Sequence, residues 1–426
     1  MSTMHTPHKG SVPQTRLSTA ASFWKGHRRY RIWLYLALVL VALSATRVIT
    51  GADDITSAGT LRAAMIAAIP IALAGLGGLW SERAGVVNIG LEGMMILGTL
   101  GAGYFTYHYG VWVGLAGAAA FGAVGGALHA LATVTFGVDH IVSGVAVNII
   151  AAGVASFLAE ALFTGLPGGG PTQSPSLERP PTLTIPGVSE WTASLASHDW
   201  FLVSDVAALL NALTARMSLF TIVALVLIFG TGWLLWRTPF GLRLRSCGES
   251  PTAAETLGVN VYRYKFVAVT MSGVFAGMGG AYLAMVASSG YQNGQTGNRG
   301  YIGLAAMIFG NWRPGGLLTG SLLFGYTDAA RLRSGGESVH ALLLIVAVAL
   351  LAIAVWQLLR GARVMAAVGF AVGAMALVWY FSTETIPGDF TQMTPYVTTL
   401  LVLALASQQL RMPAADGLRY RSGQAG

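Results

Sequence analysis

The chain has 426 residues, of which 54% are hydrophobic and only 10% are charged, well below the roughly 25% of a soluble domain. Its formal net charge of +8 does not indicate nucleic-acid binding, because the arginines lie in short segments beside apolar runs, as the positive-inside rule expects. Composition therefore excludes an ordinary soluble domain. It predicts an all-α, polytopic helical membrane bundle with about ten to twelve spans.

The segment 1–31 is long and basic, and an apolar run follows it. A secretory signal usually has a shorter basic segment, so we expect a cytoplasmic N-terminal tail and a retained first span. The transmembrane domain is predicted over 32–408 and a cytoplasmic tail over 409–426. The predicted spans lie near residues 32–49, 60–79, 86–107, 111–135, 139–164, 218–236, 263–288, 301–311, 316–333, 340–359, 364–381 and 393–408.

The stretch "WSERAGVVNIGLEGMMILG" (80–98) places charges and glycines among apolar spans. Broken helices at membrane depth are tolerated only where protein or a wet cavity surrounds them. Glu82 and Arg83 either lie in a cytoplasmic loop at 80–85, paired with each other or with a neighbour, or face a polar path. Asn88 and Glu92 lie deeper, and a path role and a structural role both stay open for them.

A similar break recurs in "GNRGYIGLAAMIFGNWRPGGLLTGSLLFG" (297–325), where Asn311, Trp312, Arg313 and Pro314 interrupt an apolar run. One interrupted segment in each half predicts half-helices and an internal inverted repeat around a central path. The 55 glycines recur with spacings that let helices approach closely in lipid. These pairs are Gly122 and Gly126, Gly273 and Gly277, Gly316 and Gly320, and Gly369 and Gly373.

Two polar segments separate the spans. Residues 165–217 are predicted to be external, either as a cap over the outer mouth or as an irregular loop with interfacial tryptophans. Residues 237–262 are basic and predicted to be cytoplasmic. Within them, Ser250 and Pro251 predict a helix start, Thr252 and Glu255 a capping box two residues later, and Gly258 a left-handed stop.

This short helix, with nothing apolar in the chain to bury it, indicates either a docking surface or an amphipathic helix at the membrane. The chain lacks the phosphate-binding loop GxxxxGK[ST], because none of its three lysines is followed by Ser or Thr. No nucleophile motif stands out. Eight scattered histidines and the single Cys247 predict neither a metal site nor an intrachain disulfide. We therefore expect no enzymatic activity.

Taken together, these segments resemble the permease subunits of ATP-binding-cassette (ABC) importers. The similar branch is that for simple sugars and nucleosides, related to the branched-chain amino-acid permeases. The segments that carry the resemblance are "SERAGVVNIGLEGMMILG" (81–98), "VDHIVSGVAVNIIAAG" (138–153), "TPFGLRLRSCGESPTAAETLGVNVYRYK" (238–265), "GNRGYIGLAAMIFGNWRPGG" (297–316) and "PGDFTQMTPYVTTLLVLALAS" (387–407).

The resemblance implies that the chain forms the path for a nucleoside or simple sugar. A separate ATPase would bind ATP and Mg²⁺, so no cofactor is expected in this chain. A second permease subunit, identical or different, and an extracytoplasmic substrate-binding lipoprotein are the other implied partners, besides membrane lipids. Polar residues of the similar segments are the candidates for the path: Asn88, Glu92, Ser143, Asn148 and Asn298. Candidates for ATPase coupling are Ser250, Pro251, Ala254, Glu255, Leu257 and Gly258.

An ion-coupled secondary transporter of a small polar solute is the first alternative. It requires carboxylates facing the core, and only Glu92, Glu160 and Asp328 are candidates. A scaffold subunit without transport activity is the second alternative.

The charge distribution makes a testable prediction about topology. Residues 237–262 and the tail should be labelled from the cytoplasmic side, and 165–217 from the outside. Single cysteines placed in a Cys247→Ser background, followed by labelling with an impermeant maleimide, measure this. Labelling of a cysteine within 180–190 from the cytoplasmic side alone would overturn the whole topology.

Overall fold

The computed structural model describes residues 31–391, 393–394, 397 and 410–423, and these residues are largely helical. Within that part, seven helices are long and apolar enough to cross a membrane. The prediction of an all-α polytopic bundle is therefore confirmed. Shorter apolar helices occur at Ala37–Thr50, Val203–Thr214 and Arg299–Phe309. The predicted tail up to residue 30 and nearly all of the predicted span 393–408 lie outside the described residues.

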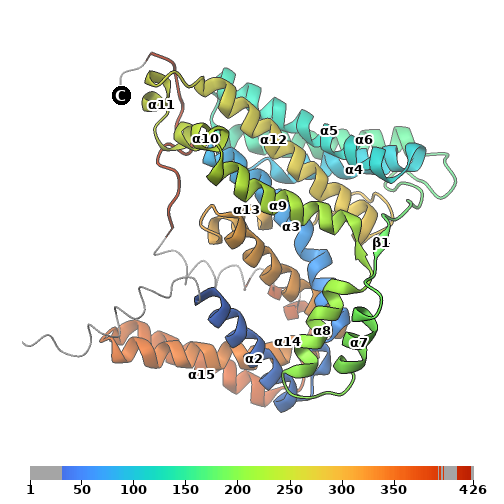
Figure 1. Cartoon of the computed structure of the whole chain (residues 1–426), viewed down its shortest axis with the longest axis vertical. Helices are drawn as coiled ribbons and strands as arrows, with labels where there is room; N and C mark the ends of the chain where they lie inside the picture. The colour runs from blue at the N-terminus through green and yellow to red at the C-terminus, as the bar shows by residue number, and fades with distance from the viewer. Residues whose placement is uncertain (1–30, 392, 395–396, 398–409, 424–426) are drawn as a thin grey trace, which may run out of the picture.

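Figure 1 labels the helices in chain order. In chain order they are α2 (Arg31–Thr50), α3 (Ala58–Arg83), α4 (Leu91–Tyr109), α5 (Val111–Ala130), α6 (His140–Phe163), α7 (Val188–Ala196), α8 (Val203–Thr214), α9 (Leu219–Arg237), α10 (Pro239–Glu249), α11 (Pro251–Thr256), α12 (Val261–Tyr282), α13 (Arg299–Phe309), α14 (Pro314–Leu359) and α15 (Arg363–Ser382). Single turns of π-helix extend α5 over Leu131–Thr135 and α12 over Leu283–Ala287. A 3₁₀ turn covers Asp53–Ile55.

Helices α3, α4 and α12 form the buried centre, and α5 packs against both α4 and α12. In contrast, α14 from Gly335 onward and α15 bury little of their surface and lie at one side of the bundle (Figure 1). Helices α10 and α11 lie at one end of the molecule, and β1 (Thr182–Leu183), α7 and α8 lie at the other. The elements of segment 237–262 and those of segment 165–217 therefore lie at opposite ends of the bundle.

Close glycine contacts hold the centre together. A methyl group at Gly122 of α5 would lie 2.2 Å from the carbonyl oxygen of Gly273 on α12. One at Gly98 of α4 would lie 2.3 Å from the carbonyl oxygen of Gly277. The predicted small-residue spacing thus does bring helix backbones into contact, and any side chain at these positions would force the helices apart.

The breaks in the helices agree in part with the sequence. Helix α14 contains a non-helical residue, Gly335, with φ 55° and ψ −124°, so it is two helices, as the separate spans 316–333 and 340–359 predicted. The loop expected at 80–85 begins later than predicted, because α3 continues to Arg83. Whether the segments around the breaks are related by an inverted repeat remains a prediction.

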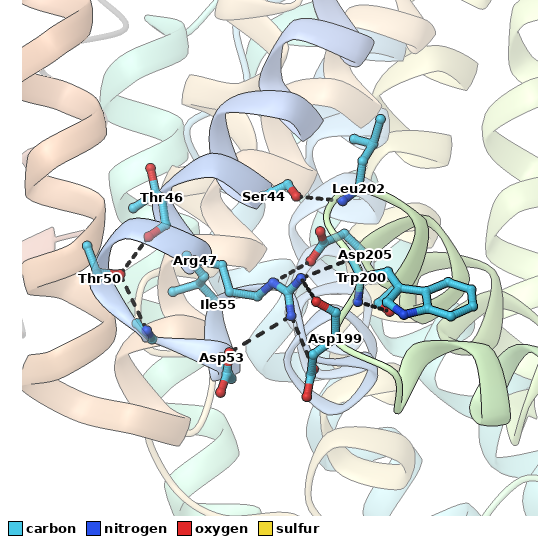
Figure 2. A network of polar contacts seen from close by, with 12 residues as sticks. Ser44, Thr46, Arg47, Thr50, Asp53, Ile55, Asp199, Trp200, Leu202 and Asp205 are labelled. Atoms are coloured by element: carbon cyan, nitrogen blue, oxygen red, sulfur yellow. Dashed lines mark hydrogen bonds and ion pairs between the residues drawn. The ribbon is translucent and has the colours of Figure 1, made fainter.

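Residues 165–217 are more ordered than an irregular loop. They contain α7, α8 and β1, which pairs antiparallel with β2 (Met217–Ser218). Arg47 of α2 holds this segment in place: its guanidinium lies 3.1 Å from the Asp205 carboxylate and 3.2 Å from that of Asp199 (Figure 2). The Arg47 and Asp205 side chains are almost fully buried. Since a buried charge needs a partner, this ion pair requires α8 to stay against α2.

The glycine contacts predict a large effect of a small substitution. Gly122→Ala overpacks the α5–α12 contact and should destabilise the protein by about 1–3 kcal/mol, measured as a lower unfolding temperature of the detergent-purified chain. Gly153→Ala on α6 is the matched control, because nothing lies within 4 Å of its added methyl. Equal unfolding temperatures of the two variants would contradict this packing.

Candidate functional site

The two helix breaks, far apart in sequence, are in direct contact. The turn 84–90 connects α3 to α4, and the turn 310–313 connects α13 to α14. The Arg83 guanidinium donates to the Trp312 carbonyl at 3.0 Å from Nε and 2.8 Å from a terminal nitrogen. The Trp312 indole in turn donates to the buried Glu82 carboxylate. Glu82 and Arg83 therefore pair with neighbouring residues rather than with each other, and through Trp312 they join the two breaks.

Asn88 closes the first turn from inside. Its side chain is fully buried, accepts from the Gly90 amide at 2.9 Å and donates to the Ser272 hydroxyl of α12 at 2.7 Å. Its amide group is thus occupied by protein atoms. In this conformation Asn88 fixes the shape of the break and does not face open space.

Glu92 lies in the first turn of α4 and contacts the start of α13. Its two carboxylate oxygens accept from the backbone amides of Asn298, at 2.9 Å, and Gly300, at 2.7 Å. The first amides of a helix have no partner within the helix, and a negative charge there also interacts favourably with the helix dipole. Glu92 therefore caps α13 from 206 residues away in the sequence. Sequence reasoning offered no signal for this contact.

Ser143 and Asn148 of α6 also hold the first break. The Ser143 hydroxyl lies 2.8 Å from Nδ1 of His129, whose Nε2 lies 3.1 Å from the Val87 carbonyl oxygen. The Asn148 carbonyl oxygen accepts from the Gly93 amide at 2.7 Å, and its Nδ2 donates to the Ile89 carbonyl at 3.0 Å. Four of the five predicted path residues thus stabilise the first break, the start of α4 or the start of α13. These four are Asn88, Glu92, Ser143 and Asn148.

One face of this region is open. Nδ2 of Asn148 also donates to the hydroxyl of Tyr301, at 2.8 Å, and the Tyr301 side chain is 40% exposed. Asn298, with a left-handed φ of 65°, is exposed beside it. We call Asn148, Asn298 and Tyr301 the polar face. Sequence reasoning missed Tyr301, because a tyrosine in an apolar segment is typical of packing as well.

The predicted loop 237–262 contains two helices instead of one. The 11-residue α10 was not predicted, and α11 runs from Pro251 to Thr256, with Gly258 left-handed at φ 80° as expected. Ser250 is the N-cap and Pro251 the first helical residue, as predicted, but the Ser250 side chain makes no capping hydrogen bond. The expectation that nothing in the chain buries this helix is wrong: Ala254 is 2% exposed and packs with Cys247 and Val261.

The C-terminal residues 410–423, here called the strap, cover this helix pair. The Ala415 amide donates to the Gly248 carbonyl at 2.8 Å, and the Ser422 hydroxyl donates to Glu255. These contacts lower the pKa of Glu255, mainly through the Ser422 hydrogen bond. Leu257, in contrast, is 84% exposed. The strap leaves part of α11 free for another surface.

The strap also reaches both breaks. The Arg411 amide donates to the Asn311 side chain at 2.8 Å, and Asp416 lies against Glu82. Burial raises the pKa of Asp416 to about 7, so the carboxyl enters this site more readily in its neutral form. Through these contacts the strap physically connects α11 with both helix breaks.

Comparisons with known proteins fit this architecture. The family described as "branched-chain amino acid transport system / permease component" matches residues 60–355. The chain belongs to this permease family. It is 30% identical over 85% of its length to the guanosine ABC transporter permease protein NupQ of Bacillus subtilis, covering 96% of that protein. No solved structure matches the permease.

Two further relatives carry related names. The permease is 31% identical to the nucleoside ABC transporter permease protein NupC of Lactococcus lactis, over 84% of this chain and 94% of that one. It is 34% identical to TsgC13 of Haloferax volcanii, a permease named for glucose, over 66% of this chain and 80% of that one. Among the residues that the structure describes, no group of three His, Cys, Asp or Glu side chains is placed to hold a metal ion.

The capping contact predicts the consequence of removing Glu92. Glu92→Ala leaves two amides at the start of α13 without a partner. It should therefore destabilise the permease by about 1–3 kcal/mol and reduce uptake as a result. Glu92→Gln retains one acceptor oxygen and should lose less.

Thermal unfolding of the purified variants, with Glu160→Ala as control because Glu160 is exposed, measures this. An unchanged unfolding temperature together with lost uptake would instead assign Glu92 to direct contact with the solute.

Proposed function

We propose that the permease forms the translocation path of an ABC importer for a nucleoside or simple sugar and has no catalytic activity of its own. The observation that carries this proposal is the similarity to two nucleoside permeases over more than four-fifths of the chain. The relative named for glucose keeps a sugar within the proposal. A substrate-binding lipoprotein outside the bacterial inner membrane would deliver the solute.

The polar face supports a second permease subunit as the other wall of the path. Neighbouring side chains on α6, such as Ile149 and Phe157, are apolar and exposed, whereas Asn148 and Tyr301 present polar groups. Polar groups at membrane depth face protein or water. We therefore place the path between the polar face and a second permease. Both NupC and NupB of Lactococcus lactis match this chain, which supports a pair of different permeases.

The α11 region, with Ser250 to Gly258, is the proposed contact with a separate ATPase. The chain lacks a phosphate-binding loop. Leu257, which directly follows α11, is exposed, and α11 lies at the end of the bundle opposite α7 and α8. On this proposal α11, the strap and both termini face the cytoplasm. The strap contacts provide a route by which movement of α11 would reach the helix breaks.

Occupied carboxylates count against the ion-coupled alternative. The Glu92 oxygens accept two amides, and Asp328 forms ion pairs with Arg299 at 3.1 Å and Arg331 at 2.8 Å. A coupling ion at either carboxylate would have to share its oxygens with these donors or displace them. Glu160, on the exposed side of α6, is the remaining candidate. Uptake driven by an ion gradient without ATPase would restore this alternative.

Glu255 tests the ATPase contact. Glu255→Arg places a positive charge on the proposed docking helix, and unfavourable charges at an interface cost several kcal/mol. We expect at least a tenfold loss of ATPase co-purification and no ATP-dependent guanosine or glucose uptake in proteoliposomes, with the membrane domain still folded. Because Glu255 also accepts from Ser422, Ser422→Ala is the matched control: it removes the strap contact and leaves the charge. Normal ATPase binding and uptake in Glu255→Arg would refute the coupling role.

A further inference from the structure

A cavity of about 360 Å³ lies between the start of α3, the end of α12 and the segments around β1 and β2. Three arginines line it: Arg62 at the start of α3, Arg179 before β1, and Arg216 before β2. The remaining lining is mainly apolar, with a hydroxyl pair at one side, where Thr221 and Tyr282 lie 2.7 Å apart. The apolar lining residues include Met65, Ile66, Met217, Met285 and Val286.

The positive charge of this cavity is not neutralised by the chain. Among the ion pairs of the described residues, none involves Arg62, Arg179 or Arg216, and no carboxylate lines the cavity. Arg62 donates only to the Asn211 side chain, at 3.3 Å, and its buried Nε has no partner among the described residues. Arg216 and Arg333 are close enough to Arg62 to oppose its charge. Like charges are held together here at a cost.

Arg47, at the same end of the molecule, shows the contrast. Three aspartates surround that guanidinium within 4 Å: Asp53, Asp199 and Asp205 (Figure 2). The fold therefore does provide carboxylates for an arginine whose role is to hold two segments together. The cavity arginines have no such carboxylate in the part of the chain that the structure describes, where Arg179 donates only to the Ser289 hydroxyl, at 3.0 and 2.8 Å. Arg179 and Arg216 are exposed, so an anion from outside the chain can reach them.

We propose that this cavity binds an organic phosphate. Guanidinium groups fit phosphate oxygens with paired hydrogen bonds, and each such charge-assisted bond is stronger than a neutral one. The volume exceeds that of a phosphate group alone and falls in the range of small-molecule sites. Apolar walls beside the arginines accommodate the carbon part of the ligand. A soluble phosphate ester and the headgroup of an anionic phospholipid share this chemistry.

The test uses the full-length permease in a nonionic detergent. Its unfolding temperature is followed while sn-glycerol 3-phosphate, or phosphatidylglycerol with phosphatidylcholine as reference, is titrated. Binding to the native state should raise the unfolding temperature in a saturable manner. The double variant Arg179→Gln/Arg216→Gln should bind at least tenfold more weakly. Both arginines are exposed, so we expect this variant to fold, with an unligated unfolding temperature like that of the unchanged chain.

Arg363→Gln is the control, since it removes one exposed positive charge from the start of α15 and leaves the cavity intact. Saturation by glycerol 3-phosphate assigns a soluble ligand, and saturation by phosphatidylglycerol alone assigns a lipid; either result supports the site. Arg62→Gln, which removes the half-buried arginine of the three, should also weaken binding of the same ligand. No saturable shift with either ligand, or equal binding by the double variant and Arg363→Gln, overturns the proposal.

Discussion

A helix that breaks inside a membrane must find partners for its freed backbone groups within the protein, because lipid offers none. Glu92 shows how the permease meets this requirement: it lies at the end of one break and caps α13, which leads to the other. Trp312 and Arg83 complete the connection at the opposite side. Each break thus supplies the hydrogen-bond partners of the other, and neither half of the molecule is complete without its counterpart.

The contacts around the breaks differ from those of the glycine-packed centre. The glycine contacts among α4, α5 and α12 leave no space for sliding, since backbone atoms touch. The turn 310–313 is different. Asn311 and Trp312 both have positive φ, a backbone conformation that residues other than glycine rarely adopt. The shape of the turn therefore depends on the contacts around it. Arg83 contacts this turn through the Trp312 carbonyl, and the strap contacts it through the Asn311 side chain.

Local patterns predicted local structure well. Apolar run length predicted the long helices, and Gly-xxx-Gly spacing predicted close helix approach, although not that α5 and α12 are the helices in contact. The rule that polar groups at membrane depth have a role drew attention to Asn88 and Glu92. Their partners could not be predicted, because Ser272 lies 184 residues from Asn88 and no periodicity links distant segments. The strap was missed for a related reason: residues 410–423 have neither helical periodicity nor apolar runs, and their order comes entirely from contacts with α10, α11 and the breaks.

Helix α10 was missed because its sequence, "PFGLRLRSCGE", alternates arginines with apolar residues and contains two glycines. Context overrides that weak propensity. Thr238 caps the helix by accepting from the Gly241 amide at 3.2 Å, and Arg245 donates to the Leu235 carbonyl at the end of α9. Gly248 lies so close to Arg83 that a methyl there would meet its carbonyl oxygen at 2.4 Å. The glycine that weakens the helix is therefore the residue that lets α10 reach the first break. Gly248 lowers the helix propensity of α10, but it permits close contact between α10, in the segment predicted to be cytoplasmic, and the end of α3 at the first break.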